Sequence, residues 1–461
     1  MTSNLSQSMK AIFTSQYDLL IRFFRLAIAN VISNIMTPLA NTLSVIFLGH
    51  LSEIHHLAGV ALAGNVLSNL YILLGFLRMG TTGVTAIAVG QDDREAVVLV
   101  GLRNGMIALI LGVVIILLQY PLGKFGFALF NTSPEIKASA IAYFNAQVWG
   151  SPAILLNFVL IGWFLGQEQN GLVVLLSFVG NAVNIALDYL FIVGWGWETT
   201  GAGLSVAISQ YLALLIGLIF LCKHVHWKEV QSLAGEIWDA SAIKSVFTLN
   251  GNIFVSYFVI LIAFVIFDYQ GAAMGKITYA ENTLLLQVYI LSNYFIEGLG
   301  FGTEILTGNF KGKGDNQQLV PLVVIAVVTS LLVGIGFGGA SVLFPQTVFG
   351  LFTNHIEVIE HINIYVPWLL LVLVCASITW SLEGYFLGVA QGHTLRNASL
   401  AATVLGFAPT ACVAFLLHSN HILWLALSLF TATRMVTLGL EFFGTFMIEA
   451  DSPRTEATDM Y

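Results

Sequence analysis

Charged residues are scarce in this 461-residue sequence: they make up 9% of the chain, against about 25% in an ordinary soluble domain. Lysine and arginine together number only 17 and are scattered, so no basic surface for a nucleic acid is expected. Hydrophobic residues, by contrast, make up 57% of the chain. Such a chain cannot cover itself with a solvated surface, which excludes a soluble enzyme, a disulfide-stabilised secreted module and a disordered protein.

Cysteine is also scarce, and the three cysteines lie far apart in apolar stretches. An odd, sparse set provides neither a disulfide framework nor the spacing of a metal site. The sequence motifs of zinc proteases, P-loop nucleotide-binding proteins and serine hydrolases are missing too. We therefore expect no catalytic residues, no metal and no cofactor, and an integral membrane enzyme is a poor alternative.

The hydrophobic residues are gathered in twelve long runs. A helix that crosses the roughly 30 Å hydrocarbon core needs about 20 apolar residues. Runs of this kind fall near residues 22–50, 56–88, 95–119, 138–166, 170–194, 201–222, 246–268, 279–309, 317–343, 361–390, 396–417 and 420–447. Residues 1–20 are polar, so no cleavable signal peptide is expected. The pattern predicts an all-α polytopic membrane protein that contacts membrane lipids.

The cations between the runs predict the orientation of the chain. With the N-terminus in the cytoplasm, twelve lysines and arginines of the loops and tails fall inside, and only Lys124, Lys137 and Lys276 fall outside. The positive-inside rule therefore predicts that both termini are cytoplasmic. The predicted parts are an N-terminal tail (1–21), an N lobe (22–222), a cytoplasmic linker with an interfacial helix (223–245), a C lobe (246–447) and a C-terminal tail (448–461).

The two halves of the chain resemble each other at a constant distance along the sequence, which we call the repeat offset. The segment GWFLGQEQ (Gly162–Gln169) closes the fourth run, and GYFLGVAQ (Gly384–Gln391) closes the tenth. The same offset relates Gly90 to Gly312 at the ends of the second and eighth runs. Six plus six spans with internal pseudosymmetry is a common architecture of secondary transporters, with the substrate route between the halves. We predict two pseudosymmetric six-helix lobes.

Polar side chains inside the apolar runs are costly and need a reason. In the N lobe they form two stripes at helical spacing, which reach a similar depth in the outer half of the membrane. The first run contributes Asn34, Thr37, Asn41 and Ser44, and the fifth contributes Asn181, Asn184 and Asp188. The stripes predict a hydrated cavity with a cation or proton site at Asp188. The alternative for Asp188 is a structural carboxylate bonded to its Asn and Ser neighbours.

The C lobe carries further polar groups at membrane depth. The eighth run contributes Asn293, Glu297 and Glu304, and the tenth contributes Glu383. We expect these four residues to line the substrate cavity. For the two arginines within runs, Arg78 and Arg434, we expect structural partners or a position near the membrane surface. A direct pair between Arg78 and Asp188 is not expected, because their depths differ.

Several segments resemble the multidrug and toxic compound extrusion (MATE) transporters, and specifically their DinF-like branch. The resemblance covers nearly all twelve runs. It is most specific in GFLRMGTTGVTAIAVGQDDRE (Gly75–Glu95) and extends through PLANTLSVIFLGHL (Pro38–Leu51), WGSPAILLNFVLIGWFLGQ (Trp149–Gln167), GNAVNIALDYLFIVGWG (Gly180–Gly196), FIEGLGFGTE (Phe295–Glu304), LEGYFLG (Leu382–Gly388) and HILWLAL (His421–Leu427). It implies alternating access and export of amphipathic, often cationic small molecules, driven by inward H⁺ or Na⁺.

The resemblance also implies a cation site in the N lobe. In this branch the site combines a first-span Asp, a fifth-span Asn and Asp, and a sixth-span Thr. Asn184 and Asp188 match the fifth-span pair, whereas the first-span Asp position is Ser44 and the Thr position is Val206. With a single carboxylate, the set favours a proton over Na⁺ as the coupling ion, and Asn181 lies beside it on the same face.

The sequence therefore predicts a monomeric antiporter of the bacterial inner membrane that exports amphipathic, cationic compounds in exchange for H⁺, with Na⁺ as the alternative ion. A lipid-linked saccharide flippase of the same superfamily is a second reading, although its pyrophosphate would need a more cationic cavity than Arg78 and Arg434 provide. A third is that Ser44 in place of the first-span Asp has altered the substrate or the coupling.

Overall fold

The computed structural model describes residues 2–51, 53–128, 132–353 and 356–451, and this part of the chain contains twelve helical segments long and apolar enough to cross a membrane. The all-α, twelve-span prediction is confirmed. The first half contains α1 (Thr2–Gly49), α2 (Ile54–Leu74), α3 (Phe76–Gly90), α4 (Arg94–Leu117), α5 (Gln119–Ala128), α6 (Pro134–Gln147), α7 (Ser151–Gly166), α8 (Asn170–Asp188) and α9 (Glu198–His224). The second contains α10 (Trp227–Ser232), α11 (Ala240–Ala273), α12 (Lys276–Lys313), α13 (Leu319–Leu343), α14 (Pro345–Gly350), α15 (Ile356–Ile362), α16 (Val366–Gly388), α17 (Gly392–Ala401), α18 (Ala408–Leu417) and α19 (Asn420–Asp451).

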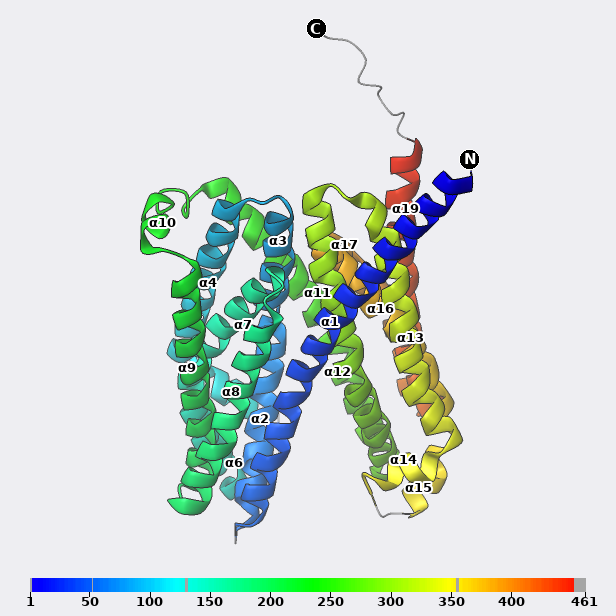
Figure 1. Cartoon of the computed structure of the whole chain (residues 1–461). Coiled ribbons are helices and arrows are strands. Elements are labelled where there is room, and N and C mark those ends of the chain that lie inside the picture. Colours follow the sequence, from blue (N-terminus) through cyan, green and yellow to red (C-terminus); the bar gives the residue numbers. More distant parts are fainter. Residues whose placement is uncertain (1, 52, 129–131, 354–355, 452–461) are drawn as a thin grey trace.

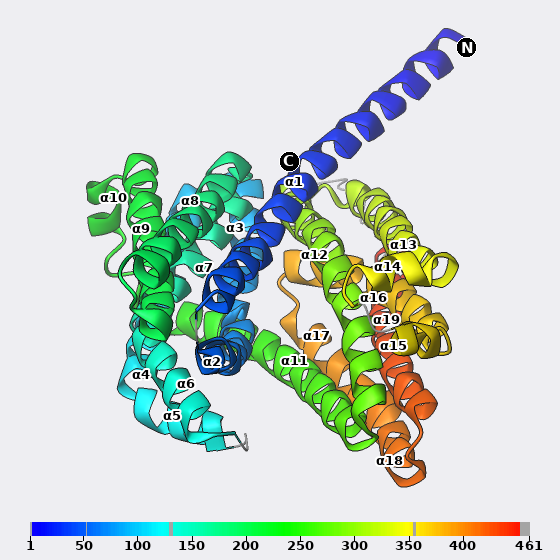
Figure 2. The ribbon, with the colours of Figure 1, turned by 90° about the horizontal axis from the view of Figure 1, so that it is seen from below.

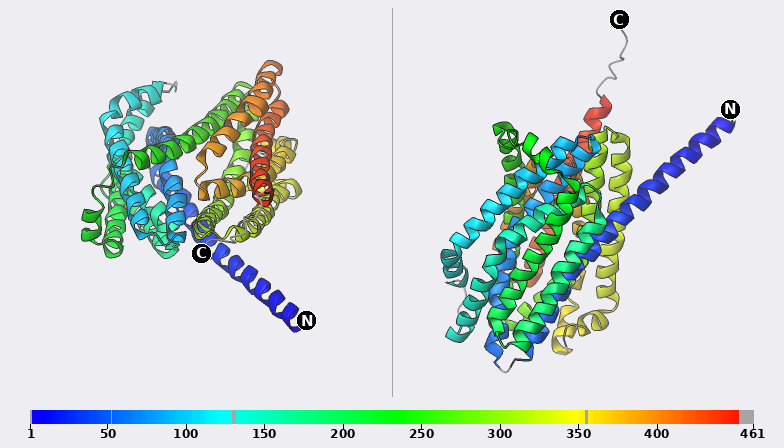
Figure 3. Two further views of the ribbon diagram at one scale, coloured as in Figure 1. Left: turned by 90° about the horizontal axis from the view of Figure 1, so that it is seen from above. Right: turned by 60° about the vertical axis from the view of Figure 1, so that its left-hand side comes forward.

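Apart from α10, which belongs to the connection between them, the helices form two bundles, one from each half of the chain (Figures 1 and 3). Helix α1 runs obliquely between the bundles and packs on both α8 and α12, as Figure 2 shows from below. The start of α1 and the end of α19 lie at one end of the molecule, which we call the terminal side; the opposite end is the distal side. The ribbons of the two lobes approach each other on the terminal side and diverge toward the distal side (Figure 1).

Local sequence explains where several helices begin and end. The Asp93 carboxylate accepts a hydrogen bond from the backbone N–H of Ala96 and caps α4, and Asp239 caps α11 in the same way. Helix α6 begins with Pro134 in its first turn, where the missing N–H costs nothing. Helix α12 ends at Gly314, whose φ of +73° favours glycine.

The internal repeat predicted from the sequence is present in the packing of the two lobes. In the N lobe, a Cβ on Gly166 of α7 would lie 2.8 Å from the carbonyl oxygen of Thr82 on α3. In the C lobe, a Cβ on Gly388 of α16 would lie 2.5 Å from the carbonyl oxygen of Glu304 on α12. The repeat offset relates Gly166 to Gly388 and Thr82 to Glu304. Equivalent pairs of helices, α3 with α7 and α12 with α16, are therefore brought together by an equivalent glycine contact in each lobe.

Glycines also bring the lobes together on the terminal side. A Cβ on Gly312 of α12 would overlap the carbonyl oxygen of Ile87 and would lie 2.9 Å from the Cα of Gly90, both on α3. A Cβ on Gly83 of α3 would overlap the carbonyl oxygen of Leu387 on α16. These contacts are between backbones, which cannot move aside for a side chain. The closed terminal side therefore depends on glycine at these positions.

We predict that Gly312→Val opens the terminal side. The added atoms overlap α3, and overpacking of this kind costs about 1–3 kcal/mol, equivalent to roughly a tenfold or larger loss of the closed state. The measurement is the rate of disulfide formation between cysteines placed at Asp92 and Asp315 in a variant free of native cysteines. Gly312→Val is expected to lower this rate. Both positions are exposed and lie close to the contact along the chain. Gly339→Val on α13 is the control, because a Cβ there meets no atom within 4 Å; equal rates in the two variants would contradict the prediction.

The connection between the lobes docks on the terminal side of the N lobe. The guanidinium of Arg94 on α4 donates to the Glu229 carboxylate of α10 at 2.5 Å, and this pairing lowers the pKa of Glu229. Trp227 and Trp238 are exposed, as expected for a segment at a membrane surface. Helix α10 is shorter than the predicted interfacial helix, however, because a turn replaces the helix after Ser232.

Candidate functional site

Asp188 lies at the end of α8, where the backbone changes from α-helix to a π-helical segment (Tyr189–Gly194). Short π segments are frequent at functional sites, because they re-aim side chains within an otherwise regular helix. The side chain is almost fully buried, with 1% of Asp188 exposed. A carboxyl group at this depth requires polar partners, and α1 and α9 of the N lobe supply them.

Two serine hydroxyls face the two carboxyl oxygens of Asp188. Ser44 on α1 donates to Oδ2, and Ser205 on α9 donates to Oδ1. The amide of Asn184, one turn before Asp188 on α8, donates to the Ser205 Oγ at 3.1 Å. These four residues, Ser44, Asn184, Asp188 and Ser205, are the Asp188 cluster.

The hydroxyl group of Ser205 corrects one prediction. Val206 was assigned to the sixth-span position of the site, which left that position without an oxygen. In the structure α9 turns Ser205 toward Asp188, so the position is filled by the preceding residue. Gly201, one turn earlier on the same face of α9, packs closely on the segment after Asp188, since a Cβ there would lie 3.0 Å from the Cβ of Phe191.

The cluster can satisfy Asp188 in both of its protonation states. When the carboxyl group is ionised, both serine hydroxyls donate to it. When it carries a proton, it can donate to one serine, because each serine has a second acceptor on its own helix. Ser44 reaches the carbonyl oxygen of Ala40 at 3.1 Å, and Ser205 reaches that of Ala202 at 2.8 Å. A proton can therefore bind to Asp188 or leave it without depriving a buried polar group of its hydrogen-bond partner.

The other N-lobe residues predicted for the site lie outside the Asp188 cluster. Asn181 donates to the carbonyl oxygen of Ser177 on its own helix at 2.8 Å. On α1, Thr37 and Asn41 are exposed and Asn34 is half-buried, so they form an accessible polar stripe toward the terminal side of Ser44. Asn34 lies 3.5 Å from the carbonyl oxygen of Tyr294 on α12, a contact between the lobes.

The C-lobe residues predicted for the substrate cavity divide into two groups. Asn293 and Glu297 are half-buried on α12. Glu383 is 2% exposed and forms an ion pair with Arg434 of α19 inside the C lobe, and Glu304 is completely buried between helices. Neither Glu304 nor Glu383 is therefore accessible in this conformation, and their place in the substrate cavity stays a prediction. Their depth could be predicted from the hydrophobic runs, but the helices that cover them could not.

The two arginines have structural partners, as expected. Arg434 pairs with Glu383, while Arg78 on α3 donates to the Asn30 side chain of α1 at 3.3 Å. The guanidinium of Arg78 also lies 3.9 Å from the ring centroid of Phe301 on α12, a cation–π contact across the lobes. Arg78 thus contacts α1 and α12 and makes no pair with Asp188 in the part of the chain that the structure describes.

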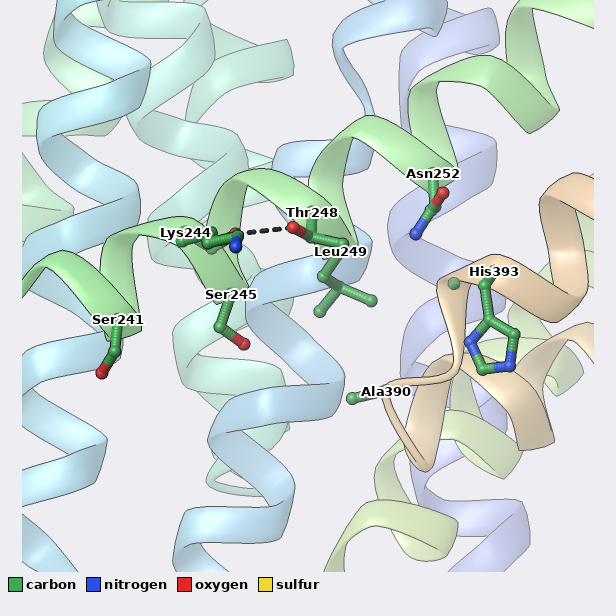
Figure 4. Close-up of a pocket in the computed structure, with 9 residues that line it drawn as sticks. Ser241, Lys244, Ser245, Thr248, Leu249, Asn252, Ala390 and His393 are labelled. Carbon is green, nitrogen blue, oxygen red and sulfur yellow. Dashed lines mark hydrogen bonds between the residues drawn. The ribbon is translucent and has the colours of Figure 1, made fainter.

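A pocket of about 370 Å³ opens elsewhere, on the terminal side. Figure 4 shows Lys244 and Thr248 on α11, with Ala390 and His393 across from them at the start of α17. The Thr248 hydroxyl donates to the Lys244 carbonyl oxygen at 2.7 Å. The lining of this pocket includes no residue of the Asp188 cluster. Within the described ranges, no group of three or more His, Cys, Asp or Glu side chains could hold a metal ion.

Comparisons with known proteins agree with this architecture. A model of the MatE family matches residues 30–190 and 252–411, two segments whose starts are related by the repeat offset. The chain is 30% identical over 419 residues to DNA damage-inducible protein F of Escherichia coli, covering 90% of each chain. It is 24% identical over 341 residues to a probable multidrug resistance protein NorM of Thermotoga maritima, covering 73% of each.

Solved structures show the same fold. An outward-facing multidrug resistance MATE family transporter of the MOP superfamily matches with a TM-score of 0.82 at 21% identity, over 94% of this chain and 96% of that one. A MOP superfamily transporter from Pyrococcus furiosus, whose binding pocket is described as having reverse polarity, matches with a TM-score of 0.81 at 21% identity, over 94% and 96%. The resemblance noted in the sequence thus extends to the three-dimensional arrangement of nearly the whole chain.

Proposed function

Because this chain belongs to the MatE family of multi-pass membrane transporters, in its DinF-like branch, we propose that it exports amphipathic, cationic organic compounds in exchange for protons. The observation that carries the proposal is the Asp188 cluster, a single buried carboxyl group held by two serine hydroxyls. The terminal side then lies in the cytoplasm of a bacterial inner membrane, in keeping with the excess of lysine and arginine in the loops on that side.

The chemistry of the cluster supports a proton as the coupling ion. A hard cation prefers several oxygen ligands and gains affinity from each carboxylate. Here Asp188 supplies the only negative charge, and both neighbouring oxygens belong to serines that have alternative hydrogen-bond acceptors. Such a set is well suited to exchange a proton for a cationic substrate, because the two compete for one negative charge.

The closed terminal side supports alternating access. Gly83, Gly90 and Gly312 hold the lobes together on that side, while Thr37 and Asn41 of α1 are exposed nearer the distal side. Arg22 of α1 adds a polar link on the terminal side: it pairs with Glu168 of the N lobe and donates to Asn309 of the C lobe at 3.0 Å. In this arrangement the polar stripe of α1 is open to protons and substrate from outside, and separation of the terminal contacts would expose it to the cytoplasm.

The test is transport by the purified protein in sealed lipid vesicles, with a fluorescent monovalent cationic dye as the probe. A pH gradient without Na⁺ is expected to drive dye accumulation of about tenfold per pH unit for one-for-one exchange. Dye movement that needs a Na⁺ gradient would make Na⁺ the coupling ion. Dye distribution that ignores both gradients would contradict a coupled exporter.

A further inference from the structure

Glu304 is the most unusual ionisable group in the molecule outside the Asp188 cluster. It lies on α12 with 0% of the residue exposed. Neither of its carboxyl oxygens has a hydrogen-bond partner among the residues that the structure describes. Buried polar groups are nearly always hydrogen-bonded, and a buried ionised carboxylate is normally paired with a cation. Glu304 therefore needs an explanation that packing alone does not provide.

The position of Glu304 is at the contact between the lobes. One turn later on α12, a Cβ on Gly308 would lie 2.7 Å from the Cβ of Ala86 and 3.0 Å from the carbonyl oxygen of Gly83, both on α3 of the N lobe. The Glu304 carboxyl group also lies near the backbone N–H of Gly83 without forming a hydrogen bond to it. When the terminal side is closed, α3 thus covers this carboxyl group.

No ionisable group around Glu304 pairs with it in the described part of the chain. The ionisable side chains on the elements that pack around this part of α12 are Arg22 on α1, Arg78 on α3, Tyr257 on α11, Glu383 on α16 and Glu297 on α12 itself. Arg22 pairs with Glu168, and Glu383 pairs with Arg434. Arg78 attracts Glu304 electrostatically, but its guanidinium contacts Asn30 and Phe301. None of these groups pairs with Glu304 in the described part of the chain.

The internal repeat shows that the fold does not require a carboxyl group at this position. The repeat offset makes Thr82 the counterpart of Glu304 in the N lobe, and the carbonyl oxygens of both residues contact the equivalent glycine of the neighbouring helix. The Thr82 hydroxyl is satisfied on its own helix, where it donates to the carbonyl oxygen of Arg78 at 2.8 Å. A small, self-satisfied side chain therefore fits the same backbone geometry.

We propose that Glu304 is a second proton-binding site, and that it must carry a proton for the lobes to close on the terminal side. With α3 packed over it and no cation bound to it, the group is accommodated only in its neutral form. When the terminal side opens, water reaches the carboxyl group and the proton leaves to that side. Reclosure then requires a proton to return. This inference rests on the proposed alternating access, to which it adds a pH-controlled gate.

The test is the distance between spin labels at Asp92 and Asp315, in a variant free of native cysteines, in lipid nanodiscs from pH 5 to pH 9 without substrate or Na⁺. Both sites are exposed beside the terminal contact. The ratio of closed to open molecules is expected to fall by up to about tenfold per pH unit as the pH rises, as for release of one proton. Glu304→Gln is expected to remain closed throughout. Glu304→Thr introduces the residue type of the counterpart in the N lobe and is also expected to remain closed. It serves as the second variant if Glu304→Gln does not fold.

Asp188→Asn is the matched control, since it neutralises the buried carboxyl group of the Asp188 cluster in the N lobe and is expected to keep the pH-dependent opening. The proposal is overturned if the unsubstituted labelled protein shows no pH dependence, if either Glu304 variant opens as that protein does, or if Asp188→Asn abolishes the opening. The distance measurement needs no dye transport. A protein that fails to export dye but opens as the pH rises would contradict the proposed function and support the proposed role of Glu304. A protein that exports dye but shows no pH-dependent opening would contradict only the role of Glu304.

Discussion

Replacing Asp188 with asparagine is expected to abolish dye accumulation driven by a pH gradient. Asparagine keeps the size of the side chain and can still bond to Ser44 and Ser205, but it cannot bind or release the exchanged proton. The accumulation of about tenfold per pH unit should therefore fall to no accumulation at all. The measurement is the vesicle assay, with dye binding in detergent recorded in parallel to separate loss of coupling from loss of substrate binding.

Asp268→Asn provides the matched control for Asp188→Asn. Asp268 lies on α11 in the C lobe, toward the distal side, where the residue is exposed instead of buried in a cluster. The same chemical change there should leave accumulation close to that of the unsubstituted protein. If Asp188→Asn still couples normally, the coupling site is not the Asp188 cluster, and the half-buried Glu297 becomes the next candidate.

The positions of the spans could be predicted from the sequence because the membrane imposes a length and an apolar composition on each of them. The predicted fourth span, 138–166, corresponds to helical residues Pro134–Gly166, and the predicted fifth span, 170–194, to Asn170–Gly194. The repeat could be predicted as well, because GWFLGQEQ and GYFLGVAQ contain the glycines that contact the neighbouring helix in each lobe. Both features depend on local composition and spacing.

The partners of the polar side chains could be predicted less well, because they depend on the rotation of one helix against another. Asp188 and Ser44 were expected at the same depth, and they are hydrogen-bonded. Ser205 was missed in favour of Val206, since a shift of one residue turns a side chain by about 100° around the helix. Glu304 and Glu383 were predicted to line the substrate cavity, and their burial was not foreseen, because a sequence shows which residues are polar but not which helix covers them.

Breaking the buried pair of Glu383 and Arg434 is expected to cause the largest loss of stability among single substitutions in the C lobe. The pair joins α16 to α19, and only 2% of Glu383 and 7% of Arg434 are exposed. Removing one partner leaves an unpaired buried charge, which typically costs about 3–5 kcal/mol. Glu383→Gln and Arg434→Met should each lower the free energy of unfolding by about this amount, measured by denaturant titration in detergent micelles.

The double variant Glu383→Gln with Arg434→Met separates a structural pair from a transport site. It removes both charges, so no charge is left unpaired, and most of the lost stability is expected to return. If the pair only joins the helices, the double variant should still accumulate dye under a pH gradient, because the Asp188 cluster lies in the other lobe. Recovered stability with lost accumulation would show that a charge of the pair takes part in transport. Single variants within about 1 kcal/mol of the unsubstituted protein would show that the pair contributes little to holding α16 against α19.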